Sequence, residues 1–266
     1  MSKADRKTSA GRAPTPAPSD PAAAWSGHFT GVALDSWLAA HPPQVTRAEA
    51  DFIARALALA PGARLLDVPC GDGRHLIALA ARGITGTGVD VGSAQLAAAR
   101  RVAAERSLPL DFVERDMREL EWTAAFDAAL CFGNSFGYFA DDGNAAFLAA
   151  VQHALVPGGR FLLDTRHVVA PGPPPFAPRT TYRTGDVLVL IEQSFDPASR
   201  RVESVTSYIR GPVVEKRHCS YRLHTYPELC ALVAGAGFVG LRGFGDLDGR
   251  PYTAECDRLL LVATRA

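Results

Sequence analysis

The stretch LLDVPCGDGRH, residues 65–75, places the tightest limit on what this chain can fold into. An apolar run ends in Asp67, a turn containing Gly71 and Gly73 follows, and a helical apolar pattern begins at Leu76. A strand that passes through a glycine turn into a helix is the repeating unit of a parallel α/β sheet. Ligands bind beyond the carboxyl ends of such strands, and glycine lets the backbone approach them because it has no Cβ. The stretch therefore predicts an α/β fold with a small-molecule site at this turn.

Strand-like and helical patterns alternate along most of the chain. Strands are expected at residues 64–68, 86–91, 110–114, 125–132, 160–165, 238–245 and 258–263, the last two joined by a short loop. Helices are expected between them at residues 73–82, 93–105, 144–155 and 226–236. Pro157-Gly158-Gly159 is expected as the turn that closes the third of these helices. This order predicts an α/β fold with a doubly wound, mostly parallel sheet that has an antiparallel edge.

The N-terminal region differs in composition from the rest of the chain. Residues 1–22 hold almost no bulky apolar side chain, so a disordered tail is expected there. Residues 23–60 carry Trp25, Phe29 and Trp37, and they predict a helical arm that closes over the ligand or caps the sheet. Its second helix is expected at residues 46–59, with Thr46 as the N-cap.

A β-rich insertion interrupts the α/β pattern. After a proline-rich breaker at residues 171–175, three runs at 187–195, 201–210 and 213–223 have strand character and are separated by turns. They predict an antiparallel β meander. We expect the main domain to span residues 61–266, with the insertion at about 171–224 acting as a lid.

Composition narrows the possible partners. Lys plus Arg and Asp plus Glu each total 28, so the chain lacks the basic surface typical of nucleic-acid or membrane binding. The five cysteines show no metal-site or redox-motif spacing, which predicts reduced thiols and no metal. With neither a membrane-length apolar run nor a signal-peptide pattern, a cytoplasmic protein with a small-molecule substrate is expected. The sequence leaves the oligomeric state open.

Chemically suggestive residues follow the first four strands. Asp67 and the glycine turn follow the first strand, and Asp90 ends the second, where a carboxylate can accept hydrogen bonds from a ribose diol. Asp116 follows the third and can accept from the exocyclic amine of adenine, while Met117 packs on the ring. The segment CFGNSFGY, residues 131–138, follows the fourth. Together they predict a nucleoside-containing ligand laid across the strand ends.

Two cofactors contain a nucleoside and fit this arrangement of residues, a dinucleotide and S-adenosylmethionine. A dinucleotide needs a third glycine in the turn, where this chain has Leu76, and the Asp72 carboxylate would repel a pyrophosphate. S-adenosylmethionine (SAM) brings an ammonium and a sulfonium, beside which an acid is favourable. An NAD-dependent oxidoreductase is therefore the less favoured alternative.

From the glycine turn onward, the chain resembles the class I, Rossmann-like SAM-dependent methyltransferases. Asp67 to Gly73 match the family's first motif, except that Pro69 stands where glycine is usual, and Gly88-Val89-Asp90 match its ribose-binding acid. The resemblance implies the sheet order 3-2-1-4-5-7-6 with strand seven antiparallel, and methyl transfer to N, O or C of a small metabolite. Small bacterial enzymes, amino-sugar N-methyltransferases among them, are the most similar type. The cofactor-binding residues it implies are Asp67, Pro69, Cys70, Gly71, Gly73, Asp90, Val91, Asp116, Met117 and Phe132.

The acceptor is expected above the ends of strands four and five. Candidate substrate-binding residues are Asn134, Ser135, Tyr138, Arg166 and His224, and candidate catalytic residues are His75, Tyr138 and His167. Each also has a plain alternative as a packing, capping or loop residue. A SAM-binding regulatory or assembly protein without turnover stays the alternative function, since a fold does not fix an activity.

Overall fold

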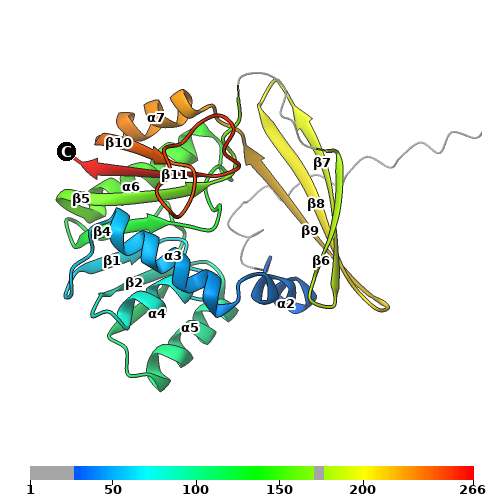
Figure 1. Ribbon diagram of the computed structural model, residues 1–266, viewed down its shortest axis with the longest axis horizontal. Helices are drawn as coiled ribbons and strands as arrows, with labels where there is room; N and C mark the ends of the chain where they lie inside the picture. The colour runs from blue at the N-terminus through cyan, green and yellow to red at the C-terminus, as the bar shows by residue number, and fades with distance from the viewer. Residues whose placement is uncertain (1–26, 171–176) are drawn as a thin grey trace, which may run out of the picture.

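The computed structural model describes residues 27–170 and 177–266. These residues form a large sheet covered by helices and a second, smaller sheet beside it (Figure 1). The expected tail over residues 1–22, Trp25 and the breaker at 171–175 lie outside the described residues. No helix in the two described ranges is both long and apolar enough to cross a membrane.

The large sheet has the strand order β3-β2-β1-β4-β5-β11-β10. Its strands are β1 (Arg64–Asp67), β2 (Thr85–Asp90), β3 (Leu110–Glu114), β4 (Phe126–Cys131), β5 (Leu155–Thr165), β10 (Phe238–Phe244) and β11 (Leu259–Arg265). The first five run parallel to one another, and β11 is antiparallel to both β5 and β10. The predicted fold class and sheet order are confirmed. The β10–β11 loop spans 245–258, however, and is longer than the short loop expected.

Helices cover both faces of this sheet. The helices of one face are α3 (Pro43–Ala56), α4 (Arg74–Ala80) and α5 (Ser93–Glu105), and those of the other are α6 (Asp141–Ala154) and α7 (Tyr226–Gly235). Successive strand residues point to opposite faces of the sheet. Leu65 therefore packs in the hydrophobic core under α3, α4 and α5, and its neighbour Leu66 packs in the core under α6 and α7. Both leucines are fully buried, and each such side chain stabilises the fold by about 2 kcal/mol.

Two local expectations about turns and caps were wrong. α3 begins at Pro43, so Thr46 lies inside the helix and its hydroxyl accepts a hydrogen bond from Arg74. Proline suits a helix start because its φ is already helical and it has no N–H to leave unpaired. Pro157-Gly158-Gly159 is an irregularity within β5 rather than a closing turn, since Leu155 pairs with Phe126 and Arg160 with Ala128.

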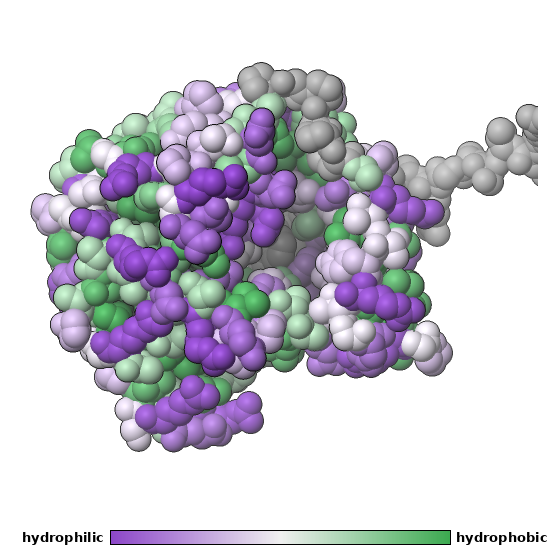
Figure 2. Space-filling model, viewed as in Figure 1, coloured by the Kyte–Doolittle hydropathy of each residue, from purple (hydrophilic) through white to green (hydrophobic). Residues whose placement is uncertain are grey.

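The second sheet has four antiparallel strands where three were expected. Its order is β6 (Arg179–Thr184), β7 (Val187–Asp196), β8 (Arg201–Arg210) and β9 (Val213–Arg222). β6 was missed because its side chains are almost all exposed, which leaves no alternation of buried apolar residues. Helix α2 (Gly31–Ala40) packs on this sheet through Val32, which contacts Val187 and Val189. Figure 2 shows the molecular surface hollowed between the second sheet and the main body.

Candidate functional site

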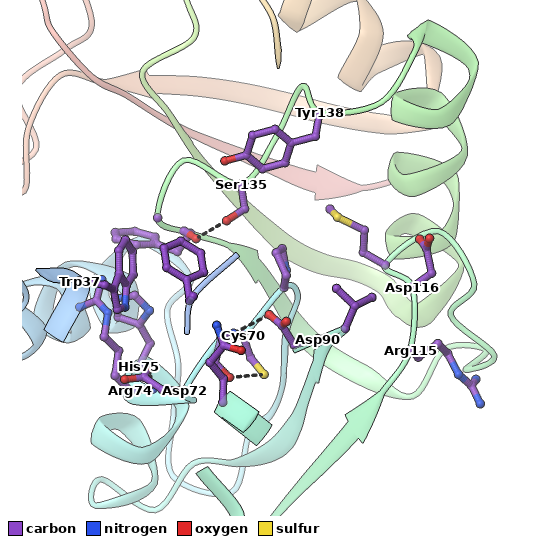
Figure 3. Close-up of a pocket in the computed structure, with 18 of the residues that line it drawn as sticks. Trp37, Cys70, Asp72, Arg74, His75, Asp90, Arg115, Asp116, Ser135 and Tyr138 are labelled. Carbon is purple, nitrogen blue, oxygen red and sulfur yellow. Dashed lines mark hydrogen bonds between the residues drawn. The ribbon is translucent and has the colours of Figure 1, made fainter. Parts of the chain in front are cut away.

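A cavity lies at the carboxyl ends of β1, β2, β3 and β4 and is closed on one side by α2 and the residues before it (Figure 3). Residues from five chain segments line it. They are Phe29, Leu34 and Trp37; Pro69, Cys70, Gly71, Asp72, Arg74 and His75; Asp90, Val91 and Gln95; Arg115, Asp116 and Met117; and Phe132, Gly133, Ser135, Tyr138 and Phe139. Eight of the ten residues expected to bind the cofactor are among them.

The two glycines of the β1 turn have different roles. Gly71 has a φ of +55°, and a Cβ built on it would meet no protein atom within 4 Å, so space for a ligand lies beside it. Gly73 has a φ of +70°, but its Cβ would lie 2.6 Å from the ring of Phe112. The structure thus places Gly73 against β3 rather than in the cavity wall, where the sequence had put it.

Asp90 connects the ends of β1 and β2. Its Oδ2 accepts a hydrogen bond from the Gly71 N–H at 2.7 Å, and its Oδ1 accepts one from the Gly92 N–H at 2.8 Å. Burial raises the pKa of Asp90, although these backbone hydrogen bonds act in the opposite direction. A carboxylate oxygen has a further lone pair, so Asp90 can also accept from a hydroxyl in the cavity.

Asp67 lies beneath the cavity and is not part of its wall. The residue is 1% exposed, and its Oδ2 has no hydrogen-bond partner in the described part of the chain. Burial raises the pKa of Asp67 well above its ordinary value, and the nearby Asp90 and Asp72 add to the effect while Arg74 opposes it. The expected cofactor role of Asp67 would therefore be indirect.

Asp116 lies at the opposite end of the cavity from Trp37 and His75 (Figure 3), and the next residue, Met117, also lines the cavity. Burial by itself would raise the pKa of Asp116, but the charge-assisted hydrogen bonds from Arg118, at 2.6 and 3.0 Å, outweigh burial and lower it. Asp116 is thus an ionised hydrogen-bond acceptor beside an apolar thioether. This pairing has the chemistry to bind an amino-substituted aromatic ring.

The loop after β4 brings two of the candidate substrate residues to the cavity. Ser135 and Tyr138 line it, and the Tyr138 hydroxyl donates to the Asn134 carbonyl at 2.8 Å. Burial raises the pKa of Tyr138 well above its ordinary value, so the phenol stays protonated. Asn134 itself lies behind the wall, where its Oδ1 accepts from the Arg166 N–H at 2.7 Å.

The other candidates after β5 and β9 lie outside the cavity wall. His167 is buried and stacked on Tyr221 at 3.9 Å; its Nδ1 lies 3.0 Å from the Phe136 carbonyl and its Nε2 lies 2.9 Å from Asn134 Nδ2. Burial lowers the pKa of both His167 and His224 to about 4. His167 therefore supports the loop instead of contacting a ligand, and neither Arg166 nor His224 reaches the cavity.

Sequence reasoning missed a buried ionic network behind the Trp37 end of the cavity. Glu49 of α3 forms ion pairs with Arg74 at 2.5 Å and Arg258 at 3.4 Å, and it lies 3.0 Å from His75 Nε2. Burial would raise the pKa of Glu49, but the hydrogen bond with His75 and the charge of Arg74 lower it to about 2. Arg258 also pairs with Asp164 through two hydrogen bonds of 2.6 and 2.9 Å. These residues come from distant parts of the chain, and no local motif marks them.

The network reaches the cavity wall at several points. The Asp164 carboxylate accepts from the Gly133 N–H at 2.8 Å, and the Arg258 guanidinium lies 4.8 Å from the centre of the Phe132 ring. Arg74, His75, Phe132 and Gly133 all line the cavity. One set of buried charges thus supports both the α4 side and the β4 side of the site.

Comparison with known proteins gives a consistent result. The family described as "Methyltransferase domain" matches residues 65–159. A "Putative methyltransferase" of Geobacillus sp. (strain WCH70) is 35% identical over 219 residues, which cover 76% of this chain and 84% of the relative. The cypemycin N-terminal methyltransferase of Streptomyces sp. is 26% identical over 245 residues, covering 88% of this chain and 90% of the relative.

A solved structure shares the architecture. It is that of SAM-bound CalS10, an amino pentose methyltransferase from Micromonospora echinaspora involved in calicheamicin biosynthesis. The two chains superpose with a TM-score of 0.61 at 25% sequence identity, over 90% of this chain and 98% of the other.

Proposed function

This chain belongs to the class I SAM-dependent methyltransferases, and we propose that it transfers the methyl group of SAM to an amine nitrogen of a small molecule. The observation that carries the proposal is the composition of the cavity at the strand ends. One end has the groups that a nucleoside needs, and on the side formed by the loop after β4 the described lining residues Ser135 and Tyr138 offer hydrogen-bonding hydroxyls and no base.

The chain's own residues fit the cofactor. Gly71 leaves open space where a side chain would otherwise project, Asp90 can accept from ribose hydroxyls, and Asp116 with Met117 can hold adenine. When bound, SAM supplies a methyl group on a positively charged sulfur, which departs as a neutral thioether. The cavity residues would then orient this group toward the acceptor and exclude water, and positioning of that kind supplies much of the rate.

The acceptor side supports an amine over a hydroxyl or a carbon acid. The Tyr138 hydroxyl has a raised pKa, and His167 is held behind the wall with both ring nitrogens beside polar partners. A neutral amine attacks with its own lone pair and needs no group to remove a proton first, whereas a hydroxyl or carbon acid does. Two relatives that match most of this chain have names that agree, an N-terminal methyltransferase and an amino pentose methyltransferase, whereas the ubiquinone biosynthesis O-methyltransferase of Xylella fastidiosa matches only 48% of it.

We also propose that the second sheet and α2 form the lid over this cavity. Glu215 of β9 accepts a hydrogen bond from the Val32 N–H at 3.1 Å, at the start of α2, and Arg217 donates to the His28 carbonyl at 2.8 Å. Leu34 and Trp37 of α2 line the cavity, and the second sheet therefore holds them in place through these hydrogen bonds. Selection of the acceptor would then depend on this sheet as much as on the large one.

Isothermal titration and a turnover assay test the proposal together. We expect purified protein to bind SAM and S-adenosylhomocysteine (SAH) but not NAD, and to form SAH when small primary or secondary amines are supplied. Asp90→Ala should weaken SAM binding at least tenfold, while Asp111→Ala, which removes an exposed carboxylate of the neighbouring strand, should leave it unchanged. Turnover with hydroxyl compounds but not amines would overturn the choice of acceptor. Binding without SAH formation over a broad amine panel would favour a SAM-binding protein without turnover.

A further inference from the structure

His75 presents a hydrogen-bond acceptor to the cavity. It is the second residue of α4, is 5% exposed and lines the cavity wall. Its Nε2 lies 3.0 Å from Oε2 of Glu49, a carboxylate that is ionised above about pH 2 and so can only accept. Nε2 therefore carries the ring proton. Nδ1 keeps a bare lone pair and has no hydrogen-bond partner among the described residues.

The imidazole is fixed in this state. Glu49 is itself held by Arg74 and Arg258, so the ring cannot turn without breaking its buried hydrogen bond to Glu49. Burial lowers the pKa of His75 although the hydrogen bond with Glu49 opposes it, and the position at a helix N-terminus also disfavours a positive charge. The ring is thus neutral at pH 7, with its acceptor atom unoccupied.

The position of His75 in the cavity indicates which part of a ligand it meets. His75, Arg74, Asp72 and Trp37 lie together at one end, while Asp116 lies at the other and Asp90 between them (Figure 3). A cofactor with adenine at Asp116 and ribose at Asp90 directs its amino-acid portion toward His75. That portion carries an ammonium group, whose N–H bonds need acceptors.

We propose that Nδ1 of His75 accepts a hydrogen bond from the amino group of the methionine portion of SAM, with the Asp72 carboxylate as its counter-charge. The inference rests on the proposed function and assigns a binding role to the Glu49–His75 pair. Glu49 acts as the positioning residue, since it sets which ring nitrogen carries the proton. A neutral imidazole suits this position because a protonated one would repel the ammonium.

Two ligands that differ only in the amino-acid portion isolate this contact. SAH carries it, and 5′-deoxy-5′-methylthioadenosine lacks it while keeping the adenosine and the thioether. We expect His75→Phe to weaken SAH binding about tenfold or more in isothermal titration, as for the loss of a hydrogen bond to a charged group. Binding of methylthioadenosine should change less than twofold. His153→Phe, on the exposed part of α6, is the matched control and should change neither.

The outcomes separate this inference from the proposed function. Unchanged SAH binding by His75→Phe would overturn the inference, and so would an equal loss for both ligands, which would indicate a general packing role. Failure of the wild-type protein to bind SAH would instead refute the proposed function. Should His75→Phe not fold, His75→Gln allows the same comparison, because its longer amide can take the place of Nε2 beside Glu49 but has no acceptor at the position of Nδ1.

Discussion

Glu49 is the side chain whose charge we expect to govern the stability of this protein in acid. Its pKa falls from the ordinary 4.5 to about 2 in the folded chain, so folding favours the ionised form. A difference of that size corresponds to about 3 kcal/mol of stability, and a residue only 5% exposed loses little of it to solvent screening. Because the folded pKa is the lower one, this stabilisation is complete above about pH 5 and disappears as the pH falls toward 2.

Urea unfolding of the wild type and Glu49→Gln at pH 7, 5, 4 and 3 measures this contribution. At pH 7 the wild type should be more stable by about 3 kcal/mol, because the variant leaves Arg74 without its anion and removes one of the two carboxylates that pair with Arg258. The gap should narrow steadily below pH 5. Glu105→Gln, at an exposed site on α5, should differ from the wild type by less than about 0.5 kcal/mol throughout. If the difference in unfolding free energy between the wild type and Glu49→Gln stays constant from pH 7 to pH 3, the claim that the ionised Glu49 carboxylate stabilises the fold is refuted.

Two further predictions concern packing and the cavity wall. Gly73→Ala should lower the free energy of unfolding, measured in urea, by about 2–3 kcal/mol because its Cβ would collide with Phe112. Gly158→Ala is the control, since Gly158 has a similar positive φ but open space around it, and it should lower the free energy of unfolding less. Equal losses for the two variants would show that backbone strain alone matters. Trp37→Ala should weaken SAM binding in isothermal titration by removing part of the wall, while Leu38→Ala, its exposed neighbour on α2, should not, and equal effects would refute the role of Trp37.

Much of the fold was predictable from local patterns. α5 and β3 lie at the residues expected, because each combines a clear periodicity with distinct boundaries. β6 could not be found this way, since a strand exposed on nearly every residue has no buried face to create a pattern. The start of α3 was misplaced because Thr46 is a good N-cap in isolation, and the preceding Pro43 is an equally good first helical residue.

The candidate site divides along the same line. Residues that follow a strand directly, such as Asp90 and Ser135, could be assigned to the site because parallel strands end at one edge of the sheet. Gly73 could not be separated from Gly71, since both satisfy the same turn and differ only in what lies beside them. The Glu49–Arg258 contact joins residues 209 positions apart, and the periodicity of helices and strands relates only residues that are close in sequence, so this contact could not be predicted.

The same contact bears on how the protein is made. Arg258 stands immediately before β11, the strand that completes the large sheet in space between β5 and β10. During synthesis Glu49 emerges from the ribosome more than two hundred residues earlier than its partner Arg258. Until Arg258 arrives, Glu49 and Asp164 lack a cation that both share, and β11 is missing beside β5. A nascent chain halted before β11 would expose an unpaired strand edge together with an incomplete site, which makes it a target for chaperones rather than a partly active enzyme.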